Sequence, residues 1–275
     1  MPPTKDIGGF LLMYFNDSRK LLIYFALKYD GDYSKIITAL ELHEELKVTP
    51  EEVEKACSTV KSKVMTILDY DYPLKLKNSC RPPIVLFYYG DITLLDDRHH
   101  KYGVVGSRDC TEYGVNVTNY YVSDMAKGTV LVSGMARGID TVGHLAQIRN
   151  GGRTIAVLGS GIDNCYPPEN YKLYKELKKK HLVISEYPNM SEPAGYHFPI
   201  RNRIVTALSD ALLVPQVRSQ FSGTMSSINM MAEMSKPIFV VPTPFTEDAI
   251  NNEILLEGAF FAKDGKEIIK QLKWD

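Results

Sequence analysis

Four short segments that combine glycine with serine are the places in this sequence best suited to binding a ligand. Each follows a run of apolar, β-forming residues or a loop leading out of one, so we expect them where strands give way to helices. Small residues there let backbone amides approach a phosphate, and a helix N-terminus adds a partial positive charge. A single such turn is explained equally well by turn geometry, but four at equivalent positions favour a phosphate-binding crevice. The segments are Gly106, Ser107 and Arg108; Ser133 and Gly134; Gly159, Ser160 and Gly161; and Ser222 and Gly223.

Arginine supplies the positive charge that this crevice needs. A planar guanidinium grips two phosphate oxygens at once, which suits repeated backbone contacts better than lysine does. Arg108 follows the first turn, Arg137 lies in the second, and Arg201 and Arg203 flank Asn202. The alternatives are solvation at the surface and internal ion pairs, and we expect one of Arg201 and Arg203 on phosphate and the other in a structural role.

Aromatic residues near these turns could stack on nucleic-acid bases, and such stacking contributes about 1–3 kcal/mol per base. Packing in the core is the alternative for Phe198, whereas Phe221 lies in an irregular polar loop. The base-stacking candidates are Tyr166, Phe198 and Phe221.

No arrangement of residues demands catalysis. Asp140 and His144 lie one helical turn apart, but no second cluster of histidine, cysteine or carboxylate completes a metal site, so we expect both to be structural. Asp163 and Glu186 follow strands and either act as acid–base groups or hydrogen-bond loop amides. We therefore expect no metal, no cofactor and no enzymatic activity.

The elements that position these residues alternate between strand and helix from about residue 70 onward. Near-continuous apolar strands separated by helices predict an α/β fold, an extended Rossmann-like, doubly wound and mostly parallel sheet. The carboxyl ends of such strands share one edge, where ligands bind. Predicted strands are Ile84–Tyr89, Tyr102–Val105, Val130–Val132, Thr154–Leu158, Leu182–Ser185, Ala211–Val214 and Ile238–Val241. Predicted helices are Tyr113–Ala126, Thr141–Arg149, Tyr171–Lys179, Asn202–Leu208 and Met225–Met234.

Residues 1–69 have helical periodicity and predict a small helical domain that precedes a second domain over residues 70–275. Thr49, Pro50 and Glu52 have the spacing of a capping box with proline at the first helical position. The small domain carries no grouped titratable residues, so we expect a docking or structural role. Lys178, Lys179 and Lys180 end a predicted helix, and we expect them only to solvate it and to complement its dipole.

Composition limits the classes of protein that this chain can be. Its 275 residues are 44% hydrophobic and 24% charged, which is typical of globular proteins. A net charge of −1 means that any nucleic acid must be held by a local basic patch. The four cysteines form no C-x-x-C pair and indicate reduced thiols in the cytoplasm. The apolar run from Phe10 to Phe15 is too short to span a membrane.

The motifs together resemble the DprA/Smf DNA-processing family. They are Gly106 to Arg108 with Tyr113 and Gly114; Ser133 to Asp140 with His144; Thr154 to Asp163 with Tyr166, Pro167 and Asn170; Ser185 to Pro188; Phe198 to Ile204; Ser222 and Gly223; and Val240 to Pro242. The resemblance implies a single-stranded DNA-binding, homodimeric protein without established catalytic activity that protects incoming DNA and loads the RecA recombinase during natural transformation. The resemblance implies a phosphate pocket made of the first three turns and residues 201–203. Within it, the resemblance gives Arg108 and Arg201 more weight as phosphate contacts than Arg137, which would then support the loop that contains it.

The chain departs from the family at three places. Gly195 and Tyr196 stand where many members have a lysine, and Gln216 replaces an acidic residue. Arg218 could compensate for the missing lysine in binding phosphate. The sequence ends at Asp275 without the winged-helix module of some members.

Two alternative functions stay open from the sequence. One is a nucleotide-processing hydrolase of the phosphoribohydrolase type, although Ser222 to Ser227 lacks that type's double glycine and glutamate. The other is a structural or nucleotide-sensing module.

Overall fold

The computed structural model describes residues 17–220, 222–244 and 249–274. At the N-terminal end lie α2 (Ser18–Lys28), α3 (Tyr33–Glu41), the 3-10 helix η1 (Glu44–Lys47) and α4 (Pro50–Cys57). The predicted capping box is confirmed: the Thr49 side chain accepts from the amide of Glu52, whose carboxylate accepts from the amide of Thr49. Leu21, Leu22 and Phe25 of α2 are fully buried, so the helical part is held together by the apolar face of this helix.

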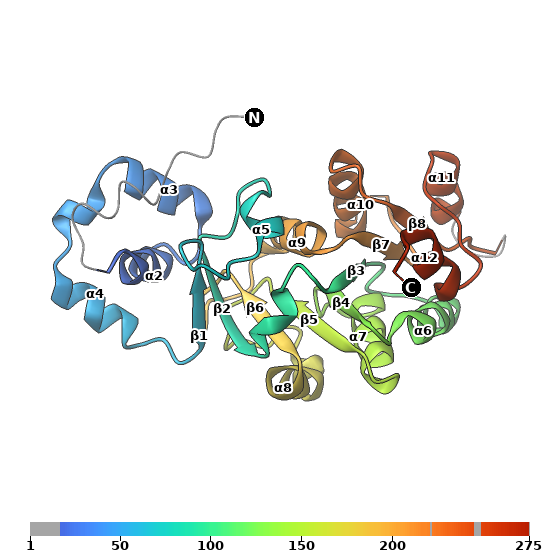
Figure 1. The fold of residues 1–275 in the computed structure, drawn as a ribbon, viewed down its shortest axis with the longest axis horizontal. Coiled ribbons are helices and arrows are strands. Elements are labelled where there is room, and N and C mark those ends of the chain that lie inside the picture. The colour runs from blue at the N-terminus through green and yellow to red at the C-terminus, as the bar shows by residue number, and fades with distance from the viewer. Residues whose placement is uncertain (1–16, 221, 245–248, 275) are drawn as a thin grey trace.

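One sheet of eight strands forms the centre of the molecule (Figure 1). The order is β1-β2-β6-β5-β4-β3-β7-β8, and all pairs from β6 to β8 are parallel. The mostly parallel α/β fold is therefore confirmed. The strands are β1 (Lys63–Thr66), β2 (Val85–Gly90), β3 (His100–Val104), β4 (Thr129–Ser133), β5 (Arg153–Val157), β6 (Leu182–Ser185), β7 (Ala211–Val214) and β8 (Ile238–Val240).

The strand β1 corrects the sequence interpretation, which extended helical periodicity to residue 69. It pairs antiparallel with β2, and β2 pairs antiparallel with β6. Only pairing with distant residues such as Tyr88 makes residues 63–66 a strand, so local periodicity could not reveal it. The sheet thus extends across the predicted domain boundary.

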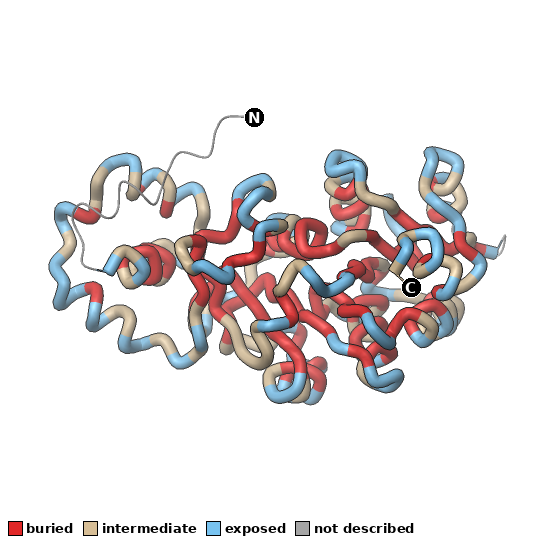
Figure 2. Tube along the Cα trace, viewed as in Figure 1, coloured by how far each residue is buried: buried red, intermediate tan, exposed pale blue. Residues whose placement is uncertain are grey.

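Helices cover both faces of the sheet (Figure 1). On one side lie α6 (Glu112–Met125), α7 (Ile139–Arg149) and α8 (Tyr171–Lys180), and on the other α9 (His197–Leu208) and α10 (Gly223–Glu233). Alternate residues of β4, β7 and β8 enter two different cores, and the buried backbone runs through the middle of the molecule (Figure 2). The remaining helices are α5 (Leu74–Lys77), η2 (Ile92–Leu95), η3 (Pro168–Asn170), α11 (Ile250–Leu256) and α12 (Gly265–Leu272).

The strand order reverses between β3 and β7, which are neighbours in the sheet but far apart in sequence. Chains leaving these two strands diverge to opposite faces, so their carboxyl ends form the topological switch point where ligands of doubly wound sheets bind. The loops that begin at Val105 and Pro215 therefore meet at this edge.

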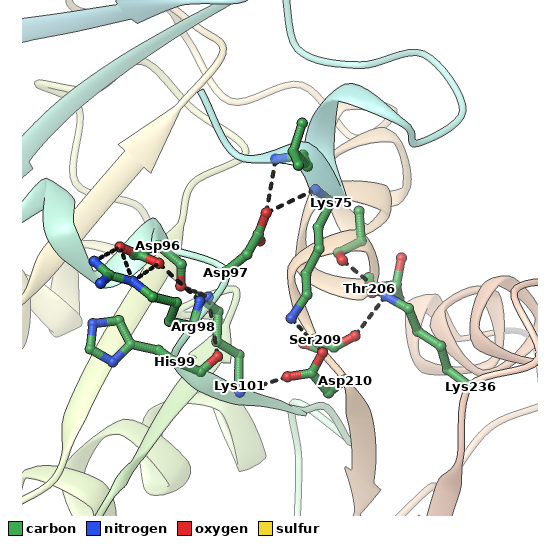
Figure 3. A network of polar contacts seen from close by, with 12 residues as sticks. Lys75, Asp96, Asp97, Arg98, His99, Lys101, Thr206, Ser209, Asp210 and Lys236 are labelled. Carbon is green, nitrogen blue, oxygen red and sulfur yellow. Dashed lines mark hydrogen bonds and ion pairs between the residues drawn. The ribbon is translucent and has the colours of Figure 1, made fainter. Parts of the chain in front are cut away.

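At the opposite edge of the sheet, a buried lysine closes the amino-terminal end of β3 (Figure 3). The fully buried Lys101 donates from Nζ to the carbonyls of Asp96 and His99. Its backbone amide donates to Asp210 at 3.0 Å, and Asp210 forms an ion pair with Lys75 at 2.5 Å. Burial, reinforced by Lys75, lowers the pKa of Lys101 to about 8.

Lys236 caps the C-terminal end of α9 at the same edge of the sheet (Figure 3). Its ammonium donates to the carbonyls of Thr206, Ala207 and Ser209 at 2.7 to 2.9 Å. A cation at a helix C-terminus complements the helix dipole, while burial lowers its pKa to about 8. Both ammonium groups at this edge thus donate to backbone carbonyls.

Candidate nucleic-acid interface

The turn after β3 is built by contacts with the loop after β7. The Ser107 amide donates to the carbonyl of Gln216 at 2.9 Å, and the Ser107 hydroxyl accepts from the Arg218 amide at 2.8 Å. A side chain at Gly106 would bring its Cβ to 2.5 Å from a carbon of Ile139, so only glycine fits there. These contacts hold the following residue, Arg108, exposed at the switch point.

Arg108 lies over an aromatic pair on the protein surface. Its guanidinium carbon is 5.2 Å from the ring centroid of Phe198, within the range of a cation–π interaction. The Phe198 ring lies 5.5 Å from that of Tyr166, which is 41% exposed. Gly159 allows this approach because a Cβ there would lie 2.7 Å from Phe198. The structure therefore brings together one predicted phosphate-binding residue and two predicted base-stacking residues from three separate segments.

Gln216, at one of the departures from the family, has a structural role. Buried Gln216 accepts from the amide of Thr111 and donates to its hydroxyl, both at 2.9 Å, and so fixes the residue that caps α6. Arg218 donates to the carbonyl of Asp109 at 2.9 Å and pairs with its carboxylate at 3.0 Å. Tyr196 is 67% exposed directly before α9. A neutral amide thus replaces the expected acid, and Arg218 lies beside the β3 turn.

The turn after β4 has a different arrangement from the one predicted. The amides of Gly134 and Ala136 both donate to the carboxylate of Asp140 at 3.2 Å, and the Ser133 hydroxyl donates to the carbonyl of Val104 at 2.6 Å. The expectation that this turn presents its amides outward is wrong for Gly134, because an internal carboxylate already accepts from it. The structural role expected of Asp140 is confirmed, and burial raises its pKa.

His144, one turn further along α7, is fully buried. Its Nδ1 lies 2.7 Å from the hydroxyl of Thr154. Burial lowers its pKa to about 3, so it is neutral at physiological pH. The structural role expected of His144 is confirmed.

Arg201 joins the ends of two strands. It is only 3% exposed, and one guanidinium nitrogen donates to the carbonyls of Gly134, at 2.8 Å, and Val157. The guanidinium lies so close to Gly134 that a Cβ there would be 2.3 Å from it. Burial lowers the pKa of Arg201 to about 10, and the nearby Asp140 opposes this shift.

Arg203 also has internal partners. Its guanidinium binds the Glu186 carboxylate through two bonds of 2.5 and 2.6 Å, and it donates to the carbonyl of Arg81 at 2.9 Å. The two charged side chains are 11% and 6% exposed. Both arginines of the predicted pair therefore bind inside the protein, and a DNA contact by either one stays a prediction.

The polar groups of the turn after β5 also have partners inside the protein. Ser160 is 1% exposed and donates to the carbonyl of Asn164, and the Gly161 amide donates to the carbonyl of Ser191 at 2.8 Å. The expectation of outward amides is thus wrong for Gly161 too. Contacts between DNA and these residues stay predictions.

The start of α10 keeps an accessible N-terminus. Ser222 is its cap residue, and the buried Ser222 hydroxyl has no hydrogen-bond partner within the described part of the chain. Gly223 is exposed, and its carbonyl accepts from Asn202 at 3.1 Å, which joins α10 to α9. The third base-stacking candidate, Phe221, lies outside the described residues.

Arg137 is exposed and forms an ion pair with Glu169, so it joins the β4 turn to η3. The neighbouring Asn170 donates to the carbonyl of Met135 at 2.9 Å and connects the same two segments. These contacts favour the loop-supporting alternative for Arg137.

Two further findings concern the whole described structure. Across residues 17–220, 222–244 and 249–274, no three histidine, cysteine or acidic side chains gather as metal ligands would. None of the helices in those ranges has the length and apolar character needed to cross a membrane.

Comparison with known proteins identifies the family. The family model for DNA recombination-mediator protein A matches residues 63–273, beginning at β1. DNA processing protein DprA of Bacillus subtilis is 38% identical over 204 residues, covering 73% of this chain and 68% of the relative. The Streptococcus pneumoniae protein of the same name is 34% identical over 211 residues, covering 76% and 74%.

Solved structures agree with this assignment. The crystal structure of the Streptococcus pneumoniae protein superposes with a TM-score of 0.77 at 30% identity, covering 91% of this chain and 92% of the other. DNA processing protein A of Helicobacter pylori, described for its unique single-stranded DNA binding mode, gives a TM-score of 0.70 at 32% identity, covering 78% and 98%. On both sequence and structure, this chain belongs to the DprA/Smf family of DNA recombination mediators.

Proposed function

We propose that this chain binds single-stranded DNA, protects it and loads the RecA recombinase onto it during natural transformation. The observation that carries the proposal is the surface cluster of Arg108, Phe198 and Tyr166. A cation beside one exposed and one half-buried aromatic ring matches the two needs of single-strand binding, since the guanidinium attracts phosphate and a ring offers a face to any base. The family and the DNA-binding structural neighbour support the same function.

The geometry favours binding that tolerates many sequences. Phe198 positions the Arg108 guanidinium, so little side-chain freedom is lost when a phosphate binds. The exposed N-terminus of α10 at Gly223 offers a second place for a phosphate, because its first amides point along the helix axis. Stacking on Tyr166 would not discriminate strongly between bases. We therefore propose that Arg201 and Arg203 position the loops and that Arg108 contacts DNA.

A homodimer in the cytoplasm is part of the proposal. Leu256, Phe260 and Phe261 are 89%, 52% and 55% exposed beside the edge strand β8, and such an apolar surface suits contact with a second copy. The cysteines are free thiols, as is typical of a reducing compartment. Sedimentation of Leu256→Lys should show a shift toward monomer, and an unchanged mass would contradict this interface.

Salt dependence of binding tests the proposed function directly. Wild type should bind single-stranded oligonucleotides with a logarithmic salt slope of about −0.7 per phosphate contacted, and Arg108→Ala should lose about one such contact. Arg98→Ala is the matched control, because Arg98 is 90% exposed and pairs with Asp96 at the opposite edge. Salt-insensitive binding, or none, would overturn the proposal. Release of a base from a nucleoside monophosphate would instead indicate the hydrolase.

A further inference from the structure

A row of lysines follows the solvent side of α8. The helix contains five lysines and one glutamate among its ten residues. Lys172, Lys175 and Lys179 are exposed, and their spacing of three and four residues places them on one helix face. Lys172 and Lys179 are seven residues apart on the helix, so these three side chains form a basic ridge about 10 Å long.

The ridge ends in a basic groove at the amino-terminal edge of the sheet. The groove is shallow and widely open to solvent, with a volume of about 710 Å³. Its cations come from Lys63 at the start of β1, Arg153 at the start of β5 and the three lysines 178–180, and Asp91 is the one carboxylate that lines it. Two strands and a helix that are distant in sequence thus bring like charges together, in a protein whose net charge is −1.

Internal partners neutralise only part of this charge. Arg153 pairs with Asp91 at 2.7 Å, and Lys180 lies 3.4 Å from Glu176. Lys178 lies 3.7 Å from Asp163 and 3.4 Å from the centroid of the Tyr89 ring.

Four other lysines, however, form no ion pair with any residue in the described ranges. They are Lys63, Lys172, Lys175 and Lys179. An uncompensated patch of this kind attracts polyanions.

A favourable interaction with the helix dipole explains why lysine occurs at only some of these positions. It suits those in the last turn of α8, as the sequence indicated. Lys172 is in the first turn, where a positive charge opposes the dipole, and Lys63 and Arg153 lie on strands. The positive surface therefore extends beyond what the helix itself requires.

The ridge begins beside the candidate interface. The helix starts one residue after Asn170, which binds the β4 turn, and Glu169 pairs with Arg137. Tyr171 at its start is 54% exposed, and the Lys175 ammonium lies 5.2 Å from the centroid of its ring. A basic path with an aromatic residue at its start thus leads from Tyr166 along α8 to the groove.

We propose that this ridge and groove bind the phosphodiester backbone of single-stranded DNA as it leaves the cluster of Arg108, Phe198 and Tyr166. The inference rests on the proposed function and extends it to a second surface. The groove is lined by lysine, arginine, aspartate and glycine alone. Such a lining recognises phosphate but offers no aromatic face for a base, so a phosphate chain fits it better than a nucleotide does.

The test compares two triple variants on short and long oligonucleotides. Lys172→Gln/Lys175→Gln/Lys179→Gln removes the ridge charges, and glutamine preserves helix propensity. Lys47→Gln/Lys55→Gln/Lys127→Gln removes the same charge from exposed lysines elsewhere and is the control. Oligonucleotides of about 6 nucleotides should reach only the aromatic cluster, and those of about 30 should also reach the ridge. Circular dichroism establishes that all variants are folded.

On the long oligonucleotide, the ridge variant should lose about 2 from the magnitude of the logarithmic salt slope, or about 0.7 for each of three contacts. The ratio of the wild-type binding constant to that of the ridge variant should then fall about 20-fold between about 50 and about 200 mM salt. The control should have the wild-type salt slope on both oligonucleotides. The ridge variant should have the wild-type salt slope on the short oligonucleotide. Equal slopes for both triple variants on the long oligonucleotide would overturn the inference. Absence of wild-type binding to either length would overturn the proposed function itself.

Discussion

Replacing Arg201 should affect the stability of the protein far more than its affinity for DNA. In Arg201→Met, the carbonyls of Gly134 and Val157 lose their donor, and Asp140 loses the cation that opposes the rise of its pKa. Removing one member of a buried charged network costs about 3–5 kcal/mol. For a chain of this size, each kcal/mol lowers the melting temperature by about 2–4 °C, so we expect a decrease of about 6–20 °C.

The pH dependence of this loss identifies its cause. Burial raises the pKa of Asp140 above its usual 3.8, so the folded protein binds the proton more tightly than the unfolded chain does. Stability therefore falls as pH rises from 3.8 to the folded pKa. Loss of Arg201 raises that pKa further and widens this range. The destabilisation by Arg201→Met should thus be larger at pH about 7 than at pH about 4.

Urea unfolding followed by circular dichroism at both pH values measures these differences. Arg108→Met is the matched control: its side chain is exposed, so its stability should stay within about 0.5 kcal/mol of wild type while its DNA affinity falls. An Arg201→Met protein with an unchanged unfolding midpoint and a reduced salt slope would refute the reasoning and make Arg201 a phosphate ligand. Equal destabilisation at the two pH values would refute the role of Asp140.

Substitutions at Phe198, Lys101 and Thr49 each test a single contact. Phe198→Ala should weaken single-strand binding by about 1–3 kcal/mol in a fluorescence titration if a base stacks on this surface, and wild-type affinity would exclude such stacking. Lys101→Met should remove a pH dependence of unfolding: the folded pKa of about 8 lies below the usual 10.5, so wild type gains stability as pH rises between these values. An exposed control, Lys127→Met, should keep that gain; equal curves for the two variants would contradict it. Thr49→Ala should cost about 1 kcal/mol by thermal melting, because it removes the capping box of α4, and an unchanged midpoint would argue against this contribution.

Much of the fold could be predicted because its signals are local. Strands such as Leu182–Ser185 and Ala211–Val214 have the predicted bounds, since each is an apolar run between residues that break it. The capping box at Thr49 depends on side chains three residues apart and was equally visible. The strand β1 was missed because its partner β2 begins nineteen residues after β1 ends.

The order of residue types along the chain places glycines, serines and arginines at the strand ends, and therefore at one edge of the sheet. Which of these side chains and amides point outward depends on how distant segments pack against one another. Arg108 and Arg201 look alike as sequence features, but Arg201 meets the carbonyls of Gly134 and Val157 while Arg108 lies exposed over Phe198. The Gly134 amide likewise turns inward because Asp140 accepts from it. A buried donor or charge must find a partner, and that partner is set by how distant segments pack.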